Sequence, residues 1–272
     1  MTGANPLNDE NEIMKTNFCN VAREGHVVIV TLSRPEVMNA LHKAADDELD
    51  VIWDEFAVDP DQWVAIVTGS GDRAFCAGND LKFQASVGGP RQYPKSGFGG
   101  LTARFDLDKP VIAAVNGVCM GGGCELALAC DIVIAAENAR FALPEPRVGM
   151  AALAGGLHRL PRTIGLKRAM GMLLTGRHVG AREAFDLGFV TALAPEGQAL
   201  DTAKAWALQL LECSPMSLRA TKQVAMRGLA FADLQDACRA EYDAVTKLRN
   251  SKDYIEGAKA FFEKRKPVWS IE

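Results

Sequence analysis

The sequence lacks several features that mark whole classes of protein. No apolar run reaches the roughly 18 residues that a membrane-spanning helix requires. There is no stripe of basic residues, and the net charge is −4, so we expect neither a nucleic-acid nor a membrane partner. The opening segment MTGANPLNDENEIMKTN has no basic or apolar part of a secretory signal. We interpret residues 1–17 as a polar, frayed tail.

The sequence also lacks the cysteine and histidine spacings of metal sites and disulfide frameworks. Its seven cysteines are an odd number, and no two of them form a C-x-x-C pair. Its four histidines are scattered along the chain without the spacing of metal ligands. We therefore expect no bound metal, and a reducing cytoplasm is the simplest compartment for so many unpaired thiols.

Short apolar stretches, by contrast, are frequent, and they predict the strands of a mostly parallel sheet. The predicted strands are residues 26–33, 63–68, 110–115 and 131–135, with a weaker candidate at 189–192. Helical patterns occupy 43–57 and about 122–130, between these strands. The alternation of apolar strands with helices is typical of an α/β fold.

The predicted secondary structure changes near residue 199. From there to the C-terminus the patterns are helical, with little strand signal. Pro195 and Gly197 lie at the change. We therefore predict a core domain over residues 18–198 and a helical region over 199–272.

Residues 82–109 contain many glycines and prolines together with several aromatic residues. Such a long irregular segment inside a domain is usually a lid or a binding loop, or is partly disordered. A mobile surface insertion is the simpler alternative.

The segment GVCMGGGCE at residues 117–125 follows a predicted strand and opens a predicted helix. The first N–H groups of a helix lack internal partners, and glycine lets a ligand approach them closely. Glu125 falls in the first turn of this helix. A tight packing joint would use the same glycines, and a dinucleotide loop would need a G-x-G-x-x-G pattern that is absent here. The segment indicates anion or oxyanion binding.

Two further segments could contribute to the same site. AFCAGNDLK at 74–82 also follows a buried strand, and the two loops could aim one backbone N–H each at a common point, which is the geometry of an oxyanion hole. FALPEPRVG at 141–149 places Glu145 between two prolines, which make the flanking backbone rigid. Taken alone, Glu145 would be interpreted as an ordinary surface carboxylate.

These three segments, together with SRPEVMNAL at 33–41, resemble the enoyl-CoA hydratase/isomerase (crotonase) family. The resemblance runs from about residue 18 to AFFEKRKPVW at 260–269. It implies a ClpP/crotonase-like spiral of ββα units with a C-terminal helical region that assembles trimers or hexamers. It also implies an acyl-CoA substrate and no tightly bound cofactor, because coenzyme A enters as part of the thioester.

The resemblance assigns roles to individual residues. The backbone N–H groups of Asn79 and Gly122 match the two oxyanion donors, and Glu125 and Glu145 match the two catalytic glutamates of the hydratases. A further set matches positions that bind the substrate or its coenzyme A: Ala40, Leu41, Ala77, Gly78, Asp80, Leu81, Lys82, Gly121 and Leu153. Phe261 or Lys264 could be lent to the coenzyme A site of a neighbouring subunit.

The two glutamates favour addition of water to the 2,3-double bond of an enoyl-CoA, or its removal from a 3-hydroxyacyl-CoA. Two carboxylates that share a site can work as acid and base on one water molecule. An enoyl-CoA isomerase and a catalytically silent acyl-CoA-binding relative are the alternatives. The dehalogenase branch would need an aspartate where this chain has Leu153, and the matching loops offer no Ser–His–Asp triad.

One stretch departs from the family pattern. Typical hydratases follow the second glutamate with Gly-x-x-Pro-Gly-x-Gly-Gly, whereas residues 149–156 here read GMAALAGG. Ala152 and Leu153 thus replace proline and glycine, which predicts an altered acyl pocket. The FALPE segment also resembles carnitinyl-CoA dehydratase-like members, so a polar or branched acyl group is one expectation, and an aromatic ring is another.

Overall fold

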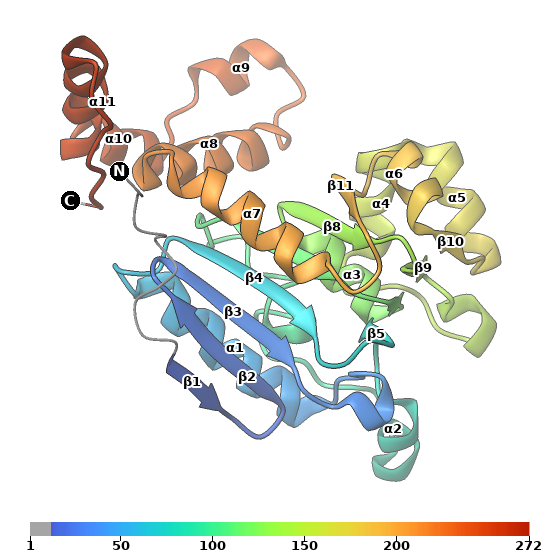
Figure 1. Ribbon diagram of the computed structural model, residues 1–272. Coiled ribbons are helices and arrows are strands. Elements are labelled where there is room, and N and C mark those ends of the chain that lie inside the picture. Colours follow the sequence, from blue (N-terminus) through green and yellow to red (C-terminus); the bar gives the residue numbers. More distant parts are fainter. Residues whose placement is uncertain (1–11, 272) are drawn as a thin grey trace.

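The computed structural model of the chain describes residues 12–271 (Figure 1). Its larger sheet has seven strands, of which β3 to β11 run parallel and β1 and β2 are antiparallel additions at one edge. In spatial order the strands are β1 (Glu12–Lys15), β2 (Cys19–Glu24), β3 (Val27–Leu32), β4 (Val64–Gly69), β6 (Val111–Val115), β8 (Ile132–Ala136) and β11 (Ala192–Ala194).

A second sheet of four short strands lies beside the first. It consists of β10 (Val179–Gly180), β9 (Arg140–Ala142), β7 (Val118–Met120) and β5 (Ala74–Cys76). Each of β4, β6 and β8 is followed along the chain by one of these short strands and then by a helical segment. The chain therefore winds as repeated ββα units, as the resemblance implied.

Helices and helical turns complete the core. They are η1 (Pro35–Val37), α1 (Lys43–Val58), α2 (Leu81–Val87), η2 (Phe98–Gly100), α3 (Gly122–Ala129), η3 (Glu145–Val148), α4 (Gly156–Ile164), α5 (Leu166–Thr175), α6 (Ala181–Leu187) and α7 (Ala199–Leu211). The predicted helices at 43–57 and 122–130 correspond to α1 and α3. The sequence patterns did not reveal α2, α4, α5 or α6.

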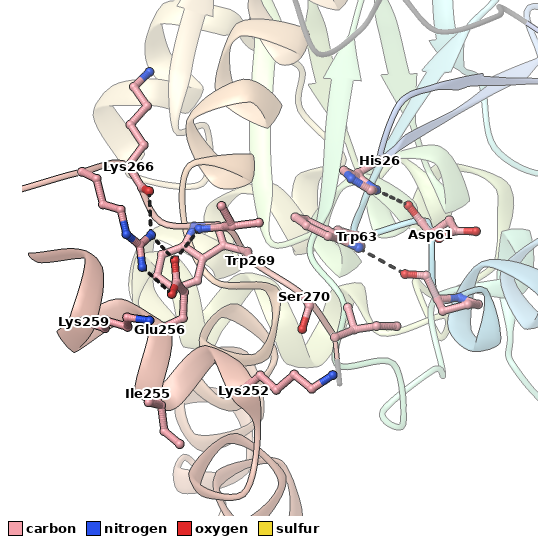
Figure 2. A pocket seen from close by; sticks show the side chains of 14 residues that line it. His26, Asp61, Trp63, Lys252, Ile255, Glu256, Lys259, Lys266, Trp269 and Ser270 are labelled. Carbon is pink, nitrogen blue, oxygen red and sulfur yellow. Dashed lines mark hydrogen bonds and ion pairs between the residues drawn. The ribbon is translucent and has the colours of Figure 1, made fainter. Parts of the chain in front are cut away.

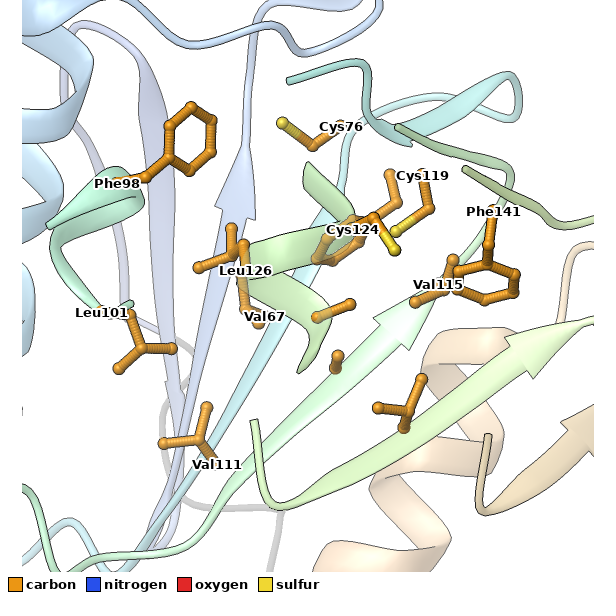
Figure 3. Packing of buried hydrophobic residues seen from close by; sticks show 14 of the residues in the cluster. Val67, Cys76, Phe98, Leu101, Val111, Val115, Cys119, Cys124, Leu126 and Phe141 are labelled. Atoms are coloured by element: carbon orange, nitrogen blue, oxygen red, sulfur yellow. The ribbon is translucent and has the colours of Figure 1, made fainter. Parts of the chain in front are cut away.

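The central strands are buried on both faces, which explains why they read as continuous apolar runs. Side chains alternate along a strand, so each strand supplies two hydrophobic clusters. On one face, Val67 and Val115 join Cys124 and Leu126 of α3 (Figure 3).

On the other face, Ile66 and Ile112 pack with α7. The residues of α7 that complete this cluster are Ala199, Ala203 and Ala207, a stripe of small residues at helical spacing. Helix α7 therefore covers the core sheet, although the predicted helical region begins with it. The boundary at 198/199 remains a prediction.

The last four helices lie together at one end of the molecule (Figure 1). They are α8 (Pro215–Gly228), α9 (Leu234–Arg239), α10 (Asp243–Arg249) and α11 (Lys252–Glu263). The helical character that the sequence predicts for this region is thus confirmed. Among the residues that the structure describes, no helix is long and apolar enough to cross a membrane.

Three expectations need correction. Residues 12–15 of the predicted frayed tail form β1, which pairs with β2, while residues 1–11 lie outside the described residues. The segment 82–109 is not merely a surface insertion, because it continues α2 and buries Phe98, which is 1% exposed. The weak strand predicted at 189–192 begins only at Ala192, because Phe189 and Val190 are buried in the core after the turn at Gly188.

Candidate active site

The two glycine-containing loops meet at the ends of β5 and β7, which are neighbouring parallel strands. Gly78 adopts a φ of 90°, and a Cβ there would lie 3.0 Å from the Gly122 nitrogen. The approach of the two loops therefore requires glycine at position 78. Leu41 holds the first loop in place, since its N–H donates to the Gly78 carbonyl at 2.8 Å and its own carbonyl accepts from the Asp80 N–H at 2.8 Å.

The second loop turns into α3 at Gly121, whose φ is 53°. A Cβ on Gly123 would lie 2.1 Å from the Cys76 carbonyl oxygen, so the start of the helix packs directly on the first loop. In the loops and turns of residues 12–271, neither the Asn79 nor the Gly122 amide donates a backbone hydrogen bond. Two neighbouring amides are thus left available to a ligand.

Glu125 lies in the first turn of α3 and is 3% exposed. Its Oε1 accepts a hydrogen bond of 2.8 Å from the Gly156 N–H at the start of α4. Burial, together with the negative charge of Glu145, raises the pKa of Glu125 to about 7, although the hydrogen bond from Gly156 opposes the shift. At neutral pH this carboxyl group can therefore give or take a proton.

Glu145 begins the helical turn η3. A Cβ on Gly121 would lie 3.1 Å from the Glu145 Oε1, so this carboxylate lies against the glycine loop. Its Oε2 is buried and has no hydrogen-bond partner among the described residues. Burial raises the pKa of Glu145 as well. Two carboxyl groups, one buried and one half-buried, thus flank the loop that carries the Gly122 amide, and neither forms an ion pair within residues 12–271.

The predicted coenzyme A residues differ in how far they are exposed. Ala40, Leu41, Gly78, Asp80 and Gly121 are buried. Leu41 packs in the main hydrophobic cluster, so only its backbone faces the loop. Leu81, Lys82 and Leu153 are exposed, and Ala77 is half-buried.

Arg34 is a structural partner that the sequence reasoning missed. Its Nη2 forms a 2.9 Å ion pair with Asp80, and its Nη1 donates to the Ala40 carbonyl. Asp80 also caps α2 by accepting from the Phe83 N–H at 2.9 Å. Arg34 therefore ties the two predicted coenzyme A segments together. The signal was present, since Arg34 lies within SRPEVMNAL.

The residues that replace the usual Pro-Gly pair behave differently from each other. Ala152 is buried in the hydrophobic core, whereas Leu153 is 79% exposed. Phe261, on α11, is 87% exposed, and Lys264 ends that helix. The structure thus groups Asn79, Gly122 and the two glutamates within one chain, but leaves Phe261 and Lys264 on a separate helix at the C-terminal end.

A second set of residues beside the site was also missed. Arg91 donates hydrogen bonds to the side chains of Asn79 and Asp46, and Phe98 packs against Gly122. Burial raises the pKa of Tyr93, and the negative charges of Asp46, Glu125 and Glu145 add to that shift. The aromatic content of residues 82–109 was the only signal of this cluster in the sequence.

A cleft lies elsewhere, between α11, the following chain and the turn before β4 (Figure 2). This cleft has a volume of about 1070 Å³, and its lining includes His26, Trp63, Glu256 and Trp269 but none of the predicted site residues. Glu256 is held there by Arg265 in a bidentate ion pair. Within residues 12–271, no group of three or more His, Cys, Asp or Glu side chains could hold a metal ion.

The ββα spiral carries two loop amides and two glutamates at one place. Comparison of the chain with known proteins identifies the class of protein that has this arrangement. The chain belongs to the enoyl-CoA hydratase/isomerase family, whose sequence model matches residues 22–271. It is 40% identical over 254 residues to a carnitinyl-CoA dehydratase of Escherichia coli K12, covering 92% of this chain and 97% of that protein.

Solved structures agree with this assignment. A crystal structure of enoyl-CoA hydratase from Mycobacterium tuberculosis H37Rv superposes with a TM-score of 0.87 at 36% identity, covering 97% of this chain and 100% of that one. A carnitinyl-CoA hydratase from Mycobacterium avium gives a TM-score of 0.75 at 37% identity over 95% of this chain and 100% of that one. The predicted crotonase fold and family are confirmed.

Proposed function

We propose that this protein is a hydratase of the 2,3-position of acyl-CoA thioesters, acting in either direction. The observation that carries the proposal is the pair of carboxyl groups, the buried Glu125 and the half-buried Glu145, beside the two available amides of Asn79 and Gly122. Membership of the enoyl-CoA hydratase/isomerase family supports a coenzyme A thioester as substrate.

The two amides hold the thioester oxygen. When a nucleophile adds at C3, negative charge moves to this oxygen, and two N–H donors stabilise the enolate that forms. Removal of one such donor typically raises the barrier by about 3–4 kcal/mol. Because both donors belong to the backbone, they are already in place before the substrate binds, and little reorganisation accompanies the reaction.

The carboxyl pair handles the proton. The pKa of Glu125 is raised in part by the negative charge of Glu145, so Glu145 ionises first and the remaining proton of the pair resides on Glu125. In hydration, the ionised carboxylate takes a proton from water as the oxygen–C3 bond forms, and the protonated one delivers its proton to C2. Dehydration reverses these steps. No redox cofactor or metal enters this balance.

The relatives favour a polar acyl group. The chain is 40% identical to a protein named carnitinyl-CoA dehydratase. We therefore propose a short 3-hydroxyacyl-CoA, or the matching enoyl-CoA, with a polar substituent. We further propose that the exposed C-terminal helices, with Phe261 and Phe262 at 87% and 88% exposure, contact other copies in a trimer or hexamer.

The test is a panel of thioesters that includes crotonyl-CoA, carnitinyl-CoA and a 3-enoyl-CoA. Hydration of crotonyl-CoA removes the ultraviolet absorbance of its conjugated double bond. We expect turnover by the wild type, a loss of at least about 100-fold in Glu125→Gln and Glu145→Gln, and unchanged turnover in Glu256→Gln, whose carboxylate lies in the C-terminal cleft. Full activity in both site variants would disprove the assignment.

Two other outcomes would replace the proposal. Conversion of the 3-enoyl-CoA to its 2-enoyl isomer without uptake of water would indicate an isomerase. Binding of acyl-CoA with no turnover of any member of the panel would indicate a catalytically silent relative.

A further inference from the structure

The buried side chain of Arg91 connects the two loops of the candidate site. Its Nη1 donates to the side-chain oxygen of Asn79, and its Nη2 forms an ion pair with Asp46 of α1. The guanidinium carbon lies 4.9 Å from the ring centres of both Tyr93 and Phe98. One side chain thus contacts the loop of the first amide and two aromatic rings.

Phe98 carries this connection to the second loop. A Cβ placed on Gly122 would lie 2.6 Å from the Phe98 ring, so the ring is packed flush against the backbone that presents the second amide. Phe98 is itself fixed through its neighbour, because the Gly99 N–H donates to Asp46 at 2.8 Å and the Gly99 carbonyl accepts from Trp53 at 2.9 Å.

Stability alone is a poor explanation for this arrangement. The side chains of Arg91 and Asp46 are 7% and 0% exposed, and the Nε of Arg91 is buried with no acceptor among the described residues. Burial of an ion pair with a donor left over is usually no more stable than apolar packing of the same volume. The planar guanidinium of Arg91, bonded through two nitrogens, is better explained by a need to hold the Asn79 loop in a fixed position.

We propose that Arg91 is a positioning residue that sets the spacing of the Asn79 and Gly122 amides, and that it does so through its hydrogen bond to the Asn79 side chain. The inference rests on the proposed function, in which these amides hold the thioester oxygen. The backbone of Asn79 does the chemistry, and its side chain locates that backbone. The side chain of residue 79 therefore matters as well as its backbone N–H.

The first experiment measures the hydration kinetics of Asn79→Ala, Arg91→Met and the double variant. Each single variant should lose roughly tenfold in kcat with KM within about twofold, because a misplaced donor weakens the transition state more than the bound substrate. The double variant should lose no more than Arg91→Met alone, because the residues act as one unit. Additive losses would overturn the proposal.

A matched control separates positioning from general destabilisation. Arg104→Met removes another arginine of the same segment, one that pairs with Asp54 and Asp106 rather than with Asn79. Melting temperatures are measured for all variants. If Arg104→Met lowers kcat as much as Arg91→Met at equal stability, the effect is not specific to the two loops and the inference fails.

The second experiment needs no turnover. Butyryl-CoA labelled with ¹³C at its carbonyl has no double bond to hydrate, and its infrared carbonyl band reports how strongly the site polarises the thioester. We expect a shift to lower frequency on binding to the wild type, reduced to about half or less in Asn79→Ala. An equal shift in both proteins would overturn the role of Arg91 and leave the amide site standing. If neither butyryl-CoA nor carnitinyl-CoA binds the wild type, the proposed function fails as well.

Discussion

The candidate site at the two glycine loops and the cleft at the C-terminal helices each contain a glutamate. The two regions shift the pKa of that glutamate in opposite directions. Burial raises the pKa of Glu125 to about 7, whereas hydrogen bonds from Arg265 lower the pKa of Glu256 to about 2. Glu256 has a bidentate cationic partner, whereas Glu125 has backbone N–H groups, those of Gly156 and Ala154. The C-terminal cleft therefore holds a paired charge, and the candidate site holds two carboxyl groups without an ion pair among the described residues. A raised carboxyl pKa is therefore a better guide to a candidate active site than the presence of a cleft.

The sharpest test of this contrast is activity. Glu145→Gln and Glu125→Gln should each lower kcat/KM for hydration by roughly 100- to 10,000-fold, because each removes one proton-transfer group. Glu256→Gln, the matched change in the cleft, should leave kcat/KM within about twofold. The measurement is initial-rate kinetics with folded variants checked by circular dichroism. A large loss in Glu256→Gln would remove the distinction between the two regions.

Glycine substitutions give the next largest effect. A Cβ on Gly122 would meet the Phe98 ring at 2.6 Å, so Gly122→Ala must move either the ring or the amide. We expect hydration to slow by roughly tenfold or more and the free energy of unfolding to fall by about 1–3 kcal/mol.

Gly171 of α5 is the control for that substitution, since nothing lies within 4 Å of a Cβ there. Gly171→Ala should leave the rate unchanged and stabilise the helix by up to about 1 kcal/mol. Equal behaviour of the two alanine variants would show that close packing at position 122 is unimportant.

The pH dependence of the rate follows from the shared proton. As pH rises through about 7, the pair goes from one proton to none because Glu125 ionises, so kcat/KM should fall on the alkaline side with a midpoint near that pH. The residual rate of Glu125→Gln should lack this alkaline limb, because glutamine does not titrate. A flat profile from pH 6 to 9 in the wild type would contradict the assignment.

The smallest expected effect is on stability. The pKa of Glu125 is higher in the folded chain than its ordinary value of 4.5. The folded state therefore binds this proton more tightly, and that contribution to stability is complete below pH 4.5 and lost as pH rises through about 7. Glu125→Gln should be more stable than the wild type at pH 8 by up to about 3 kcal/mol, and nearly equal to it at pH 4.5.

Glu256→Gln should show the opposite dependence. Its pKa is lowered in the folded chain, so its contribution is present above pH 4.5 and lost as pH falls toward 2. Glu256→Gln should therefore melt at a lower temperature than the wild type at pH 8, with the difference fading in acid. Thermal melts of both variants at three pH values test these two opposite pH dependences of stability together.

The sequence predicted the elements whose pattern of apolar residues is long and regular. The strands at 63–68 and 110–115 were recognisable because they are apolar on both faces, and α1 because its apolar residues share one stripe. The strands β5, β7 and β9 were missed because each has three residues, too few for a period to appear. The helix α2 was masked by the glycines and prolines that follow it.

The sequence by itself determined which segments are candidates for the chemistry: two loops with glycine where the backbone must be approached, and two glutamates in rigid surroundings. Only the tertiary structure decided that Glu125 is buried, that the Glu145 Oε2 has no hydrogen-bond partner among the described residues, and that Arg91 reaches Asn79 and Asp46. The physical reason is distance along the chain. Glycine conformation and strand burial are local properties, whereas the pKa of a carboxyl group and the partner of a guanidinium depend on residues brought together from distant segments.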